Sequence, residues 1–184
     1  SAMPQSPAEA QAQTRSPALA GEEESQSAQT KLLFDLSGID LAAEAVSKKM
    51  LESVNPHRGA MALLGGVVWQ TPDFCRGIGV HRARPDEFWC EGHFPNNPIM
   101  PGVLMVEVGA QLACYLYNVR MKNTNIAVFL RIEDCSFRAM VKPGQDLFVL
   151  CQEVKASRRR FISDIQGMVE GKVAFQAQIT GMSM

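Results

Sequence analysis

The chain has 184 residues, of which 46% are hydrophobic and 20% are charged, as in ordinary globular proteins. Its 18 Lys and Arg residues against 19 Asp and Glu residues give a formal net charge of −1, which argues against the large basic field that nucleic-acid binding needs. No apolar run reaches the roughly 18 to 20 residues of a membrane-spanning helix, and the chain does not open on a secretory signal pattern. We therefore expect a cytoplasmic protein with no nucleic-acid partner and no membrane span.

The first 30 residues differ in composition from the rest of the chain. They consist almost wholly of Ala, Ser, Gln, Glu and Pro, contain no aromatic residue, and begin with Ser1-Ala2, which is typical of a cloning remnant. This composition offers too little apolar surface to offset the entropy of ordering. We predict a disordered leader over residues 1–30 and a single domain over residues 31–184.

Hydrophobic periodicity predicts a first helix and then a series of strands, some before and some after a second helix in the sequence. Apolar residues at three- and four-residue steps predict the first helix over residues 40–54, which Pro56 ends. Glu170-Gly171, between the apolar runs at 161–169 and 173–180, has the character of a two-residue hairpin turn. Runs of β-forming residues bounded by turn residues predict strands over 60–69, 74–84, 126–137, 147–154, 161–169 and 173–180.

One segment among the strands, residues 103–119, is apolar on every side and about five helical turns long. A helix that is apolar all round is a buried helix. Several antiparallel strands before and after a single buried helix indicate an α+β architecture, with the antiparallel sheet wrapped around one long central helix.

The cysteines are spread through the chain without a CxxC pair. A domain of this size does not need disulfide staples. We expect reduced, mostly buried thiols at Cys75, Cys90, Cys114, Cys135 and Cys151.

Glu107 is the one formal charge within the apolar helix. An isolated buried carboxylate is costly unless it is protonated or partnered, so its presence invites a functional explanation. Gln111 follows one helical turn later on the same face, where its amide can orient the carboxylate. A structural pairing of Glu107 with an Arg or a backbone amide elsewhere in the core is the alternative interpretation.

His93 stands on a loop rich in proline and glycine that runs into the start of the same helix. Such a loop is stiff, and the helix N-terminus offers unpaired N–H groups, including that of Gly102. Because Gly102 has no Cβ, a substrate carbonyl can approach this amide closely, as in an oxyanion hole. A histidine, a carboxylate and a helix N-terminus together indicate acid–base chemistry beside a carbonyl group.

The string HFPNNPIMPGVLMVEVGAQ, from His93 to Gln111, closely resembles the signature of the FabZ-type 3-hydroxyacyl-[acyl-carrier-protein] dehydratases of bacterial fatty-acid synthesis. The histidine and the glutamate stand at the family's fourteen-residue separation, with its proline pattern between them. Pro56-His57-Arg58 and residues 137–144 and 169–173 resemble further motifs of the family. The resemblance covers about residues 54–181.

This resemblance implies a hotdog fold, assembled as homodimers and often as trimers of dimers. The implied reaction removes water from a (3R)-hydroxyacyl thioester of acyl carrier protein or CoA to give a trans-2-enoyl thioester, with no metal or organic cofactor. On this template His93 takes the C2 proton and the Gly102 amide holds the thioester oxygen. Glu107 of the partner subunit delivers a proton to the departing hydroxyl.

Three residues depart from the family pattern, of which Gln145, in place of the usual Asp after Pro143-Gly144, is a surface change without an assigned role. Asn96 stands where the family usually has Gly, and Asn is the next most tolerant residue if the loop requires a positive φ. Arg131 occupies a strand position where the family often has Gly, close to the expected acyl tunnel, which a long cationic side chain could shorten or plug. Phe94 and Phe129 are candidates for either the tunnel lining or the core.

Some cationic residues late in the chain are candidates for docking an acidic carrier protein, although a charge run at a turn is normally just a solvated loop. They are Arg138, Lys142, Lys155 and Arg158. His57 is expected to be structural, with its ring bracing the end of the first helix.

Two other functions use the same architecture. A hotdog acyl thioesterase also has a carboxylate on the central helix but does not require the His-Phe-Pro loop. A noncatalytic acyl-thioester-binding protein needs neither His93 nor Glu107. The joint presence of these two residues favours the dehydratase.

Overall fold

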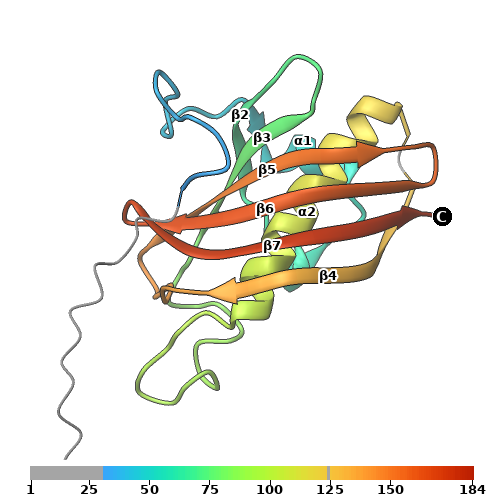
Figure 1. Ribbon diagram of the computed structural model, residues 1–184. Helices are drawn as coiled ribbons and strands as arrows, with labels where there is room; N and C mark the ends of the chain where they lie inside the picture. The colour runs from blue at the N-terminus through green and yellow to red at the C-terminus, as the bar shows by residue number, and fades with distance from the viewer. Residues whose placement is uncertain (1–30, 124) are drawn as a thin grey trace, which may run out of the picture.

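A computed structural model describes residues 31–123 and 125–184. In this part of the chain, a seven-stranded antiparallel sheet curls around one long helix (Figure 1). The α+β architecture expected from the sequence is therefore confirmed. The leader predicted over residues 1–30 lies outside the described residues.

The sheet has the strand order β1-β2-β3-β5-β6-β7-β4, and every neighbouring pair is antiparallel. The strands are β1 (Val46–Ser47), β2 (Gly66–Gln70), β3 (Arg76–Arg82), β4 (Ala127–Phe137), β5 (Asp146–Ala156), β6 (Arg160–Val169) and β7 (Lys172–Ser183). The helices are α1 (Lys48–Val54), the single 3-10 turn η1 (Gly59–Met61) and the central helix α2 (Gly102–Met121).

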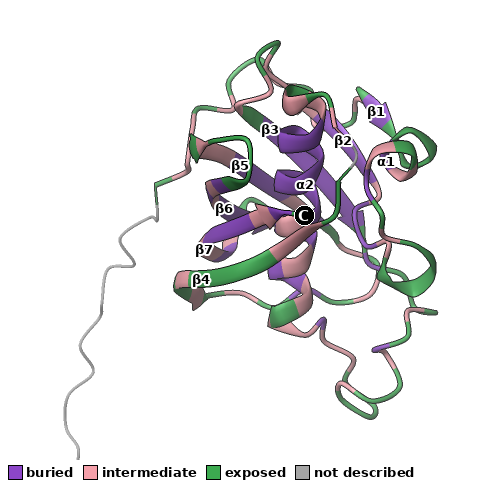
Figure 2. Cartoon of the chain, turned by 90° about the vertical axis from the view of Figure 1, so that its right-hand side faces the viewer, coloured by how far each residue is buried: buried purple, intermediate pink, exposed green. Residues whose placement is uncertain are grey.

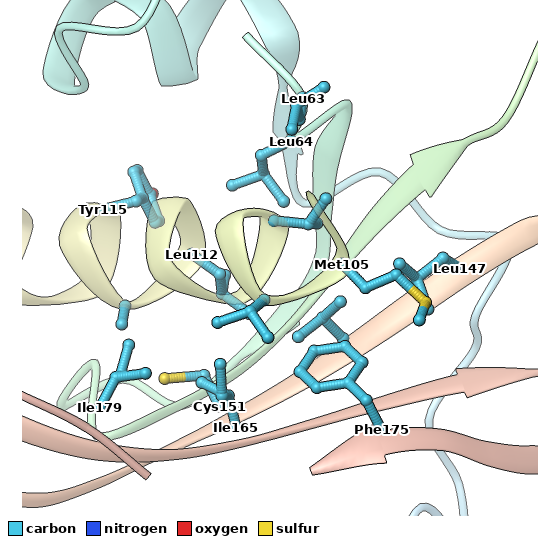
Figure 3. Packing of buried hydrophobic residues seen from close by; sticks show 14 of the residues in the cluster. Leu63, Leu64, Met105, Leu112, Tyr115, Leu147, Cys151, Ile165, Phe175 and Ile179 are labelled. Carbon is cyan, nitrogen blue, oxygen red and sulfur yellow. The ribbon is translucent and has the colours of Figure 1, made fainter. Parts of the chain in front are cut away.

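The core lies between α2 and the inner face of the sheet. Buried side chains of the helix and the strands meet there, among them Leu112, Ile165 and Phe175 (Figure 3). Among the described residues, α2 is the one helix long and apolar enough to cross a membrane, and 72% of its apolar 18-residue window is buried inside the fold. Burial of that extent is what the core helix of a globular domain shows.

Part of the outer face of the sheet, over β2, β3, β5 and β6, is covered by residues 31–41, which we call the N-terminal strap. Its backbone is held by the side-chain amide of Gln166, which accepts a hydrogen bond from Leu33 N at 3.2 Å and donates one to Lys31 O at 3.1 Å. The ring centroid of Phe34 lies 5.7 Å from that of Trp69. The apolar side chains of the strap pack on an outer-face cluster formed by Val68, Ile78, Val80, Leu150 and Met168.

The first helix is shorter than the sequence predicted. A helix over residues 40–54 is wrong in its first half, because α1 begins at Lys48. Ser47 caps the helix by accepting a hydrogen bond from Met50 N at 3.4 Å, and Val46 and Ser47 pair with β2 as the short strand β1. The sheet edge and the cap therefore fix the start of the helix.

The strand predicted over residues 60–69 is also wrong in its first half. Here η1 comes first, and β2 begins only at Gly66. The cause is the side chain of Gln111 on α2, which accepts a hydrogen bond from Leu64 N at 3.0 Å and donates one to Met61 O at 2.7 Å. These backbone groups are therefore hydrogen-bonded to a side chain of the helix, and they do not form the hydrogen bonds to a neighbouring strand that a longer β2 would require.

The C-terminal half follows the sequence prediction closely. The strands predicted from residue 126 onward correspond to β4, β5, β6 and β7. The two-residue hairpin is confirmed, with Glu170 at φ 49° and Gly171 at φ 74°. Within the described chain β4 ends the sheet, and its outer side is exposed (Figure 2).

The expectation that the cysteines are mostly buried is wrong, although all five are free thiols. Cys114 and Cys151 are buried, and burial raises the pKa of each of these thiols to about 12. Cys75 and Cys90 are partly exposed, and Cys135 is exposed on the edge strand β4. An edge strand leaves its outward side chains uncovered, which the sequence around Cys135 did not reveal.

Candidate active site

His93 is held on the long loop between β3 and α2, which runs along the lower part of Figure 1. Its backbone N–H donates to Trp89 O at 2.9 Å, and its Nδ1 lies 2.8 Å from Ile99 O. A carbonyl oxygen can only accept, so Nδ1 carries the proton of the neutral ring. The lone pair is therefore on Nε2, which can act as a base.

The residues that follow His93 brace it. The peptide bond between His93 and Phe94 is cis, and the two rings are stacked with centroids 4.2 Å apart. Phe94 and Asn97 exchange two backbone hydrogen bonds, and Asn96 between them has φ 64°. Asn96 thus adopts the left-handed conformation that a glycine would otherwise supply, so this departure from the family pattern leaves the tight turn intact.

Gly102 is the first residue of α2, directly after the N-cap residue Pro101. The first N–H groups of a helix have no partner within it, and they point toward a ligand placed before the helix. A Cβ on Gly102 would lie only 2.7 Å from the ring of Phe137. The absence of a Cβ at Gly102 therefore lets the ring of Phe137 lie close to the start of the helix, where the first N–H groups have no partner within the helix.

Glu107 contacts the polar partner that its helix position predicted. Gln111 is buried and donates from Nε2 to Glu107 Oε1 at 2.9 Å. The hydrogen bonds of Gln111 to Met61 and Leu64 leave its amide no freedom to turn. The contact that their helical spacing predicts between Gln111 and Glu107 is therefore present, and the orienting role of Gln111 stays a prediction.

His57 lies against the same carboxylate, which the sequence interpretation missed. Its Nε2 is 3.4 Å from Glu107 Oε1, and the two side chains are 26% and 19% exposed. Burial lowers the pKa of His57, the negative charge of Glu107 opposes this, and Arg58 adds to the lowering. Glu107 and the Pro56-His57-Arg58 motif were both visible in the sequence, but nothing in the sequence indicated that His57 contacts Glu107.

The end of α1 is braced by Arg58 and not, as expected, by His57. The Arg58 guanidinium donates to Glu52 O at 2.6 Å and to Asn55 O at 2.7 Å. These are carbonyls at the C-terminal end of the helix, where a cation is favourable. A long guanidinium can reach them, whereas the His57 ring points to Glu107.

A cleft with an empty volume of about 340 Å³ leads away from Glu107 and His57 between α2, β4 and β7. Its remaining lining is mainly apolar: Ala110, Cys114, Ala127, Val128, Phe129, Phe161, Ile179 and Gly181. Phe129 therefore lies on the wall, whereas Arg131 is outside the lining and its guanidinium is 3.1 Å from Glu133 Oε1. Phe94 is half-exposed and likewise lies outside the lining of this cleft.

His93 and Glu107 are not brought together within the described chain. The histidine whose ring nitrogen lies within 4.0 Å of the Glu107 carboxylate is His57. Elsewhere in residues 31–123 and 125–184, no group of three or more His, Cys, Asp or Glu side chains could hold a metal ion. Within one chain, Glu107 therefore contacts His57, whereas His93 contacts the backbone of its own loop.

The four cations proposed to dock a carrier protein do not form one patch. Arg138 and Lys142 precede β5, whereas Lys155 and Arg158 lie at its far end. A strand of this length separates the two pairs by roughly 30 Å. The first pair lies near the start of α2, because Val141 O accepts a hydrogen bond from Met100 N just before the helix. The second pair lies near its end, where Tyr117 Oη donates to Ser157 O at 2.9 Å.

Solved structures share this fold at low sequence identity. The dehydratase heterocomplex ApeI:P of Xenorhabdus doucetiae aligns with a TM-score of 0.63 at 13% identity, covering 73% of this chain and 90% of that one. A sigma28-regulated virulence protein of Campylobacter jejuni aligns with a TM-score of 0.57 at 13% identity, covering 79% and 95%. These likenesses support the hotdog fold alone.

Sequence relatives carry more information. A family model described as a FabA-like domain matches residues 55–178. The 3-hydroxyacyl-[acyl-carrier-protein] dehydratase FabZ of Alkaliphilus metalliredigens is 37% identical over 123 residues, which is 66% of this chain and 79% of that protein. The FabZ of Rickettsia africae is 36% identical over 132 residues, or 69% of this chain and 88% of that protein. The chain therefore belongs to the FabA-like family and, within it, to the FabZ-type 3-hydroxyacyl-[acyl-carrier-protein] dehydratases.

Proposed function

We propose that this protein removes water from (3R)-hydroxyacyl thioesters to give trans-2-enoyl thioesters in fatty-acid biosynthesis or a related lipid pathway of the cytoplasm. The observation that carries the proposal is the state of His93. Its ring is fixed through Nδ1 to Ile99 O at 2.8 Å, which leaves the lone pair on Nε2 available as a base. A thioesterase would not need a base held in this way.

In the proposed reaction, His93 Nε2 removes the C2 proton, and the electrons of the C–H bond pass toward the thioester carbonyl. The Gly102 N–H stabilises the negative charge that develops on the carbonyl oxygen. The C2–C3 double bond then forms as the C3–O bond breaks, and Glu107 of the partner subunit gives its proton to the departing hydroxyl. The products are the enoyl thioester and one water molecule.

A site shared between two chains agrees with the separation of His93 from Glu107 in one chain. The edge strand β4 carries apolar side chains that are 42% to 49% exposed, namely Phe129, Leu130 and Ile132. Pairing of such an edge with a second copy would cover them. We propose a homodimer formed along this edge, and trimers of dimers as its further assembly.

The apolar cleft beside Glu107 is the proposed site of the acyl chain. Its length preference is set by the walls of this cleft, including Phe129. The carrier is proposed to be acyl carrier protein, an acidic partner that Arg138 and Lys142 would attract near the loop of His93. A CoA thioester would use the same site without that docking.

The function is tested by incubating the purified protein with 3-hydroxyacyl carrier thioesters of several lengths. We expect the conjugated enoyl thioester to form, with turnover at least about 100-fold lower in His93→Ala and in Glu107→Gln. Release of free thiol without enoyl product would identify a thioesterase. Binding without any product would identify an acyl-thioester-binding protein.

A second experiment tests the shared site. Unfolding His93→Ala and Glu107→Ala together and refolding them makes about half of the dimers mixed, and each mixed dimer has one intact site. Roughly a quarter of wild-type activity should return from two inactive proteins. If mixed dimers form and no activity returns, both residues belong to one chain or neither is catalytic.

A further inference from the structure

The carboxylate of Glu107 has two polar neighbours, and both lie on the same oxygen. Gln111 Nε2 is 2.9 Å from Oε1, and His57 Nε2 is 3.4 Å from it. We propose that His57 is a positioning residue for Glu107. Together with Gln111 it engages Oε1, so that Oε2 is the oxygen that carries and delivers the proton. This inference rests on the proposed dehydratase function.

The surroundings of the two ring nitrogens of His57 favour one protonation state of the ring. The ring Nδ1 is buried and has no hydrogen-bond partner among the described residues. A proton there would be a buried donor without an acceptor, which is costlier than an unused lone pair. The neutral ring therefore carries its proton on Nε2, the nitrogen that lies 3.4 Å from Glu107 Oε1.

Burial of the ring favours its neutral form, against the attraction of one neighbouring charge. Glu107 on α2 and Arg58 on the same segment are the charged groups that act on His57. Burial outweighs the attraction of Glu107, so the pKa of His57 is lowered, and the ring is neutral at pH 7. A neutral donor can hold the carboxyl group without forming a full ion pair with it.

Donors on two different elements can fix the orientation of the Glu107 carboxyl group, which one donor cannot. The last torsion of a glutamate side chain is broad, so a single hydrogen bond leaves the carboxyl group free to rotate about the bonded oxygen. Gln111 reaches Glu107 from the same helix, one turn on, whereas His57 reaches it from the segment after α1. Donors from two elements restrict the rotation and fix the direction of Oε2.

The segment that carries His57 is itself anchored at both sides. Asn55 Nδ2 donates to the backbone carbonyl of Gln111 at 2.8 Å, and both side chains are buried. Arg58 bonds back to the carbonyls of Glu52 and Asn55. The position of His57 relative to α2 is therefore built into the fold before any substrate binds.

The kinetic test compares His57→Leu, which removes the donor, with His57→Gln, which keeps an N–H donor on a side chain of similar reach. We expect His57→Leu to lower kcat about tenfold with KM changed less than about twofold, and His57→Gln to recover most of the loss. His81→Gln is the matched control, because His81 is a buried histidine whose Nδ1 lies 2.8 Å from a backbone carbonyl oxygen, Leu63 O, and not from a carboxylate. It should lower the melting temperature without this split between kcat and KM.

A merely structural His57 would give a different result. In that case His57→Leu and His57→Gln would lower thermal stability alike, and kcat of the folded fraction would stay at the wild-type value. Equal kcat in wild type and folded His57→Leu overturns the proposal. So does an equal loss of kcat in both variants, because the N–H donor would then be irrelevant.

A second arm needs no turnover. The His57 imidazole is titrated by NMR in wild type and in Glu107→Gln, with His57→Gln used to assign its signals. Because the charge of Glu107 raises the pKa of His57 against the effect of burial, removing that charge should lower it further. If neither the pKa nor the chemical shifts of the His57 ring changed, the contact would be overturned. If wild type shows no dehydration, the proposed function fails, and this arm still decides whether His57 holds Glu107.

Discussion

The ring of Phe137 occupies the space into which a side chain at Gly102 would extend, since a Cβ there would lie 2.7 Å from its edge. Phe137 is half-exposed, so its ring can swing aside, and Gly102→Ala should fold at a cost of about 1 kcal/mol. The added methyl group would still stand beside the N–H that is proposed to hold the thioester oxygen. We therefore expect kcat to fall at least about tenfold, measured beside thermal unfolding.

The double variant Gly102→Ala with Phe137→Leu separates packing from catalysis. Leucine has no ring edge at the point of contact, so the lost stability should return. Activity should stay low if the methyl group blocks the carbonyl oxygen. Full recovery of activity would show that Gly102 serves packing alone.

Arg131 is predicted to limit the acyl chain, even though its guanidinium bonds to Glu133 at 3.1 Å in the single chain. It lies two residues after Phe129 on the edge strand, where a second copy would enclose it. Arg131→Gly should shift the preference toward longer acyl chains, measured as kcat/KM against chain length. Phe129→Ala, which opens a known wall of the cleft, is the control. A profile changed by Phe129→Ala and unchanged by Arg131→Gly would place Arg131 outside the tunnel.

His57 should make the stability of the protein depend on pH. An unfolded histidine titrates near 6.5, and in the folded protein burial lowers the pKa of His57 below that value. As the pH falls below 6.5, the unfolded state binds a proton that the folded state does not. The free energy of unfolding therefore decreases between pH 6.5 and the lower pKa of the folded protein, and the contribution of His57 is fully present above pH 6.5. His57→Gln removes the titrating group. Its melting temperature should fall less than that of wild type between pH 7 and pH 5.

The parts of the site that depend on local spacing could be predicted from the sequence. Gln111 reaches Glu107 because they are one helical turn apart, and the loop of His93 is stiff because of its own prolines. The contact between His57 and Glu107 joins residues fifty positions apart, and it depends on how the segment after α1 lies on α2. No periodicity encodes that placement.

The same distinction explains the errors at the element boundaries. Residues 40–47 have helical spacing, yet the strap and β1 use their apolar side chains on the sheet. Residues 61–64 have strand character, yet the amide of Gln111 takes their backbone hydrogen bonds. In both cases a tertiary partner overrides a local pattern, because packing energies exceed intrinsic propensities.

Removal of the N-terminal strap should cause self-association. A chain lacking residues 1–41 would expose the outer-face cluster around Ile78 and Leu150, and a contiguous apolar patch of this kind favours aggregation. Light scattering after size-exclusion chromatography should show larger species than a chain lacking only residues 1–30, which keeps the strap. Equal particle sizes for the two truncated chains would contradict this role.

The strap also divides the sheet into regions of different mutational tolerance. Strand β5 is covered on both sides, and its residues Leu147 to Cys151 form an unbroken apolar run, whereas β7 alternates apolar residues with Gln176 and Gln178. Polar substitutions should therefore be accepted on the outward side of β7 and rejected at Leu150. A saturation library of the outer face would trace the footprint of residues 31–41 as a zone where only apolar residues survive.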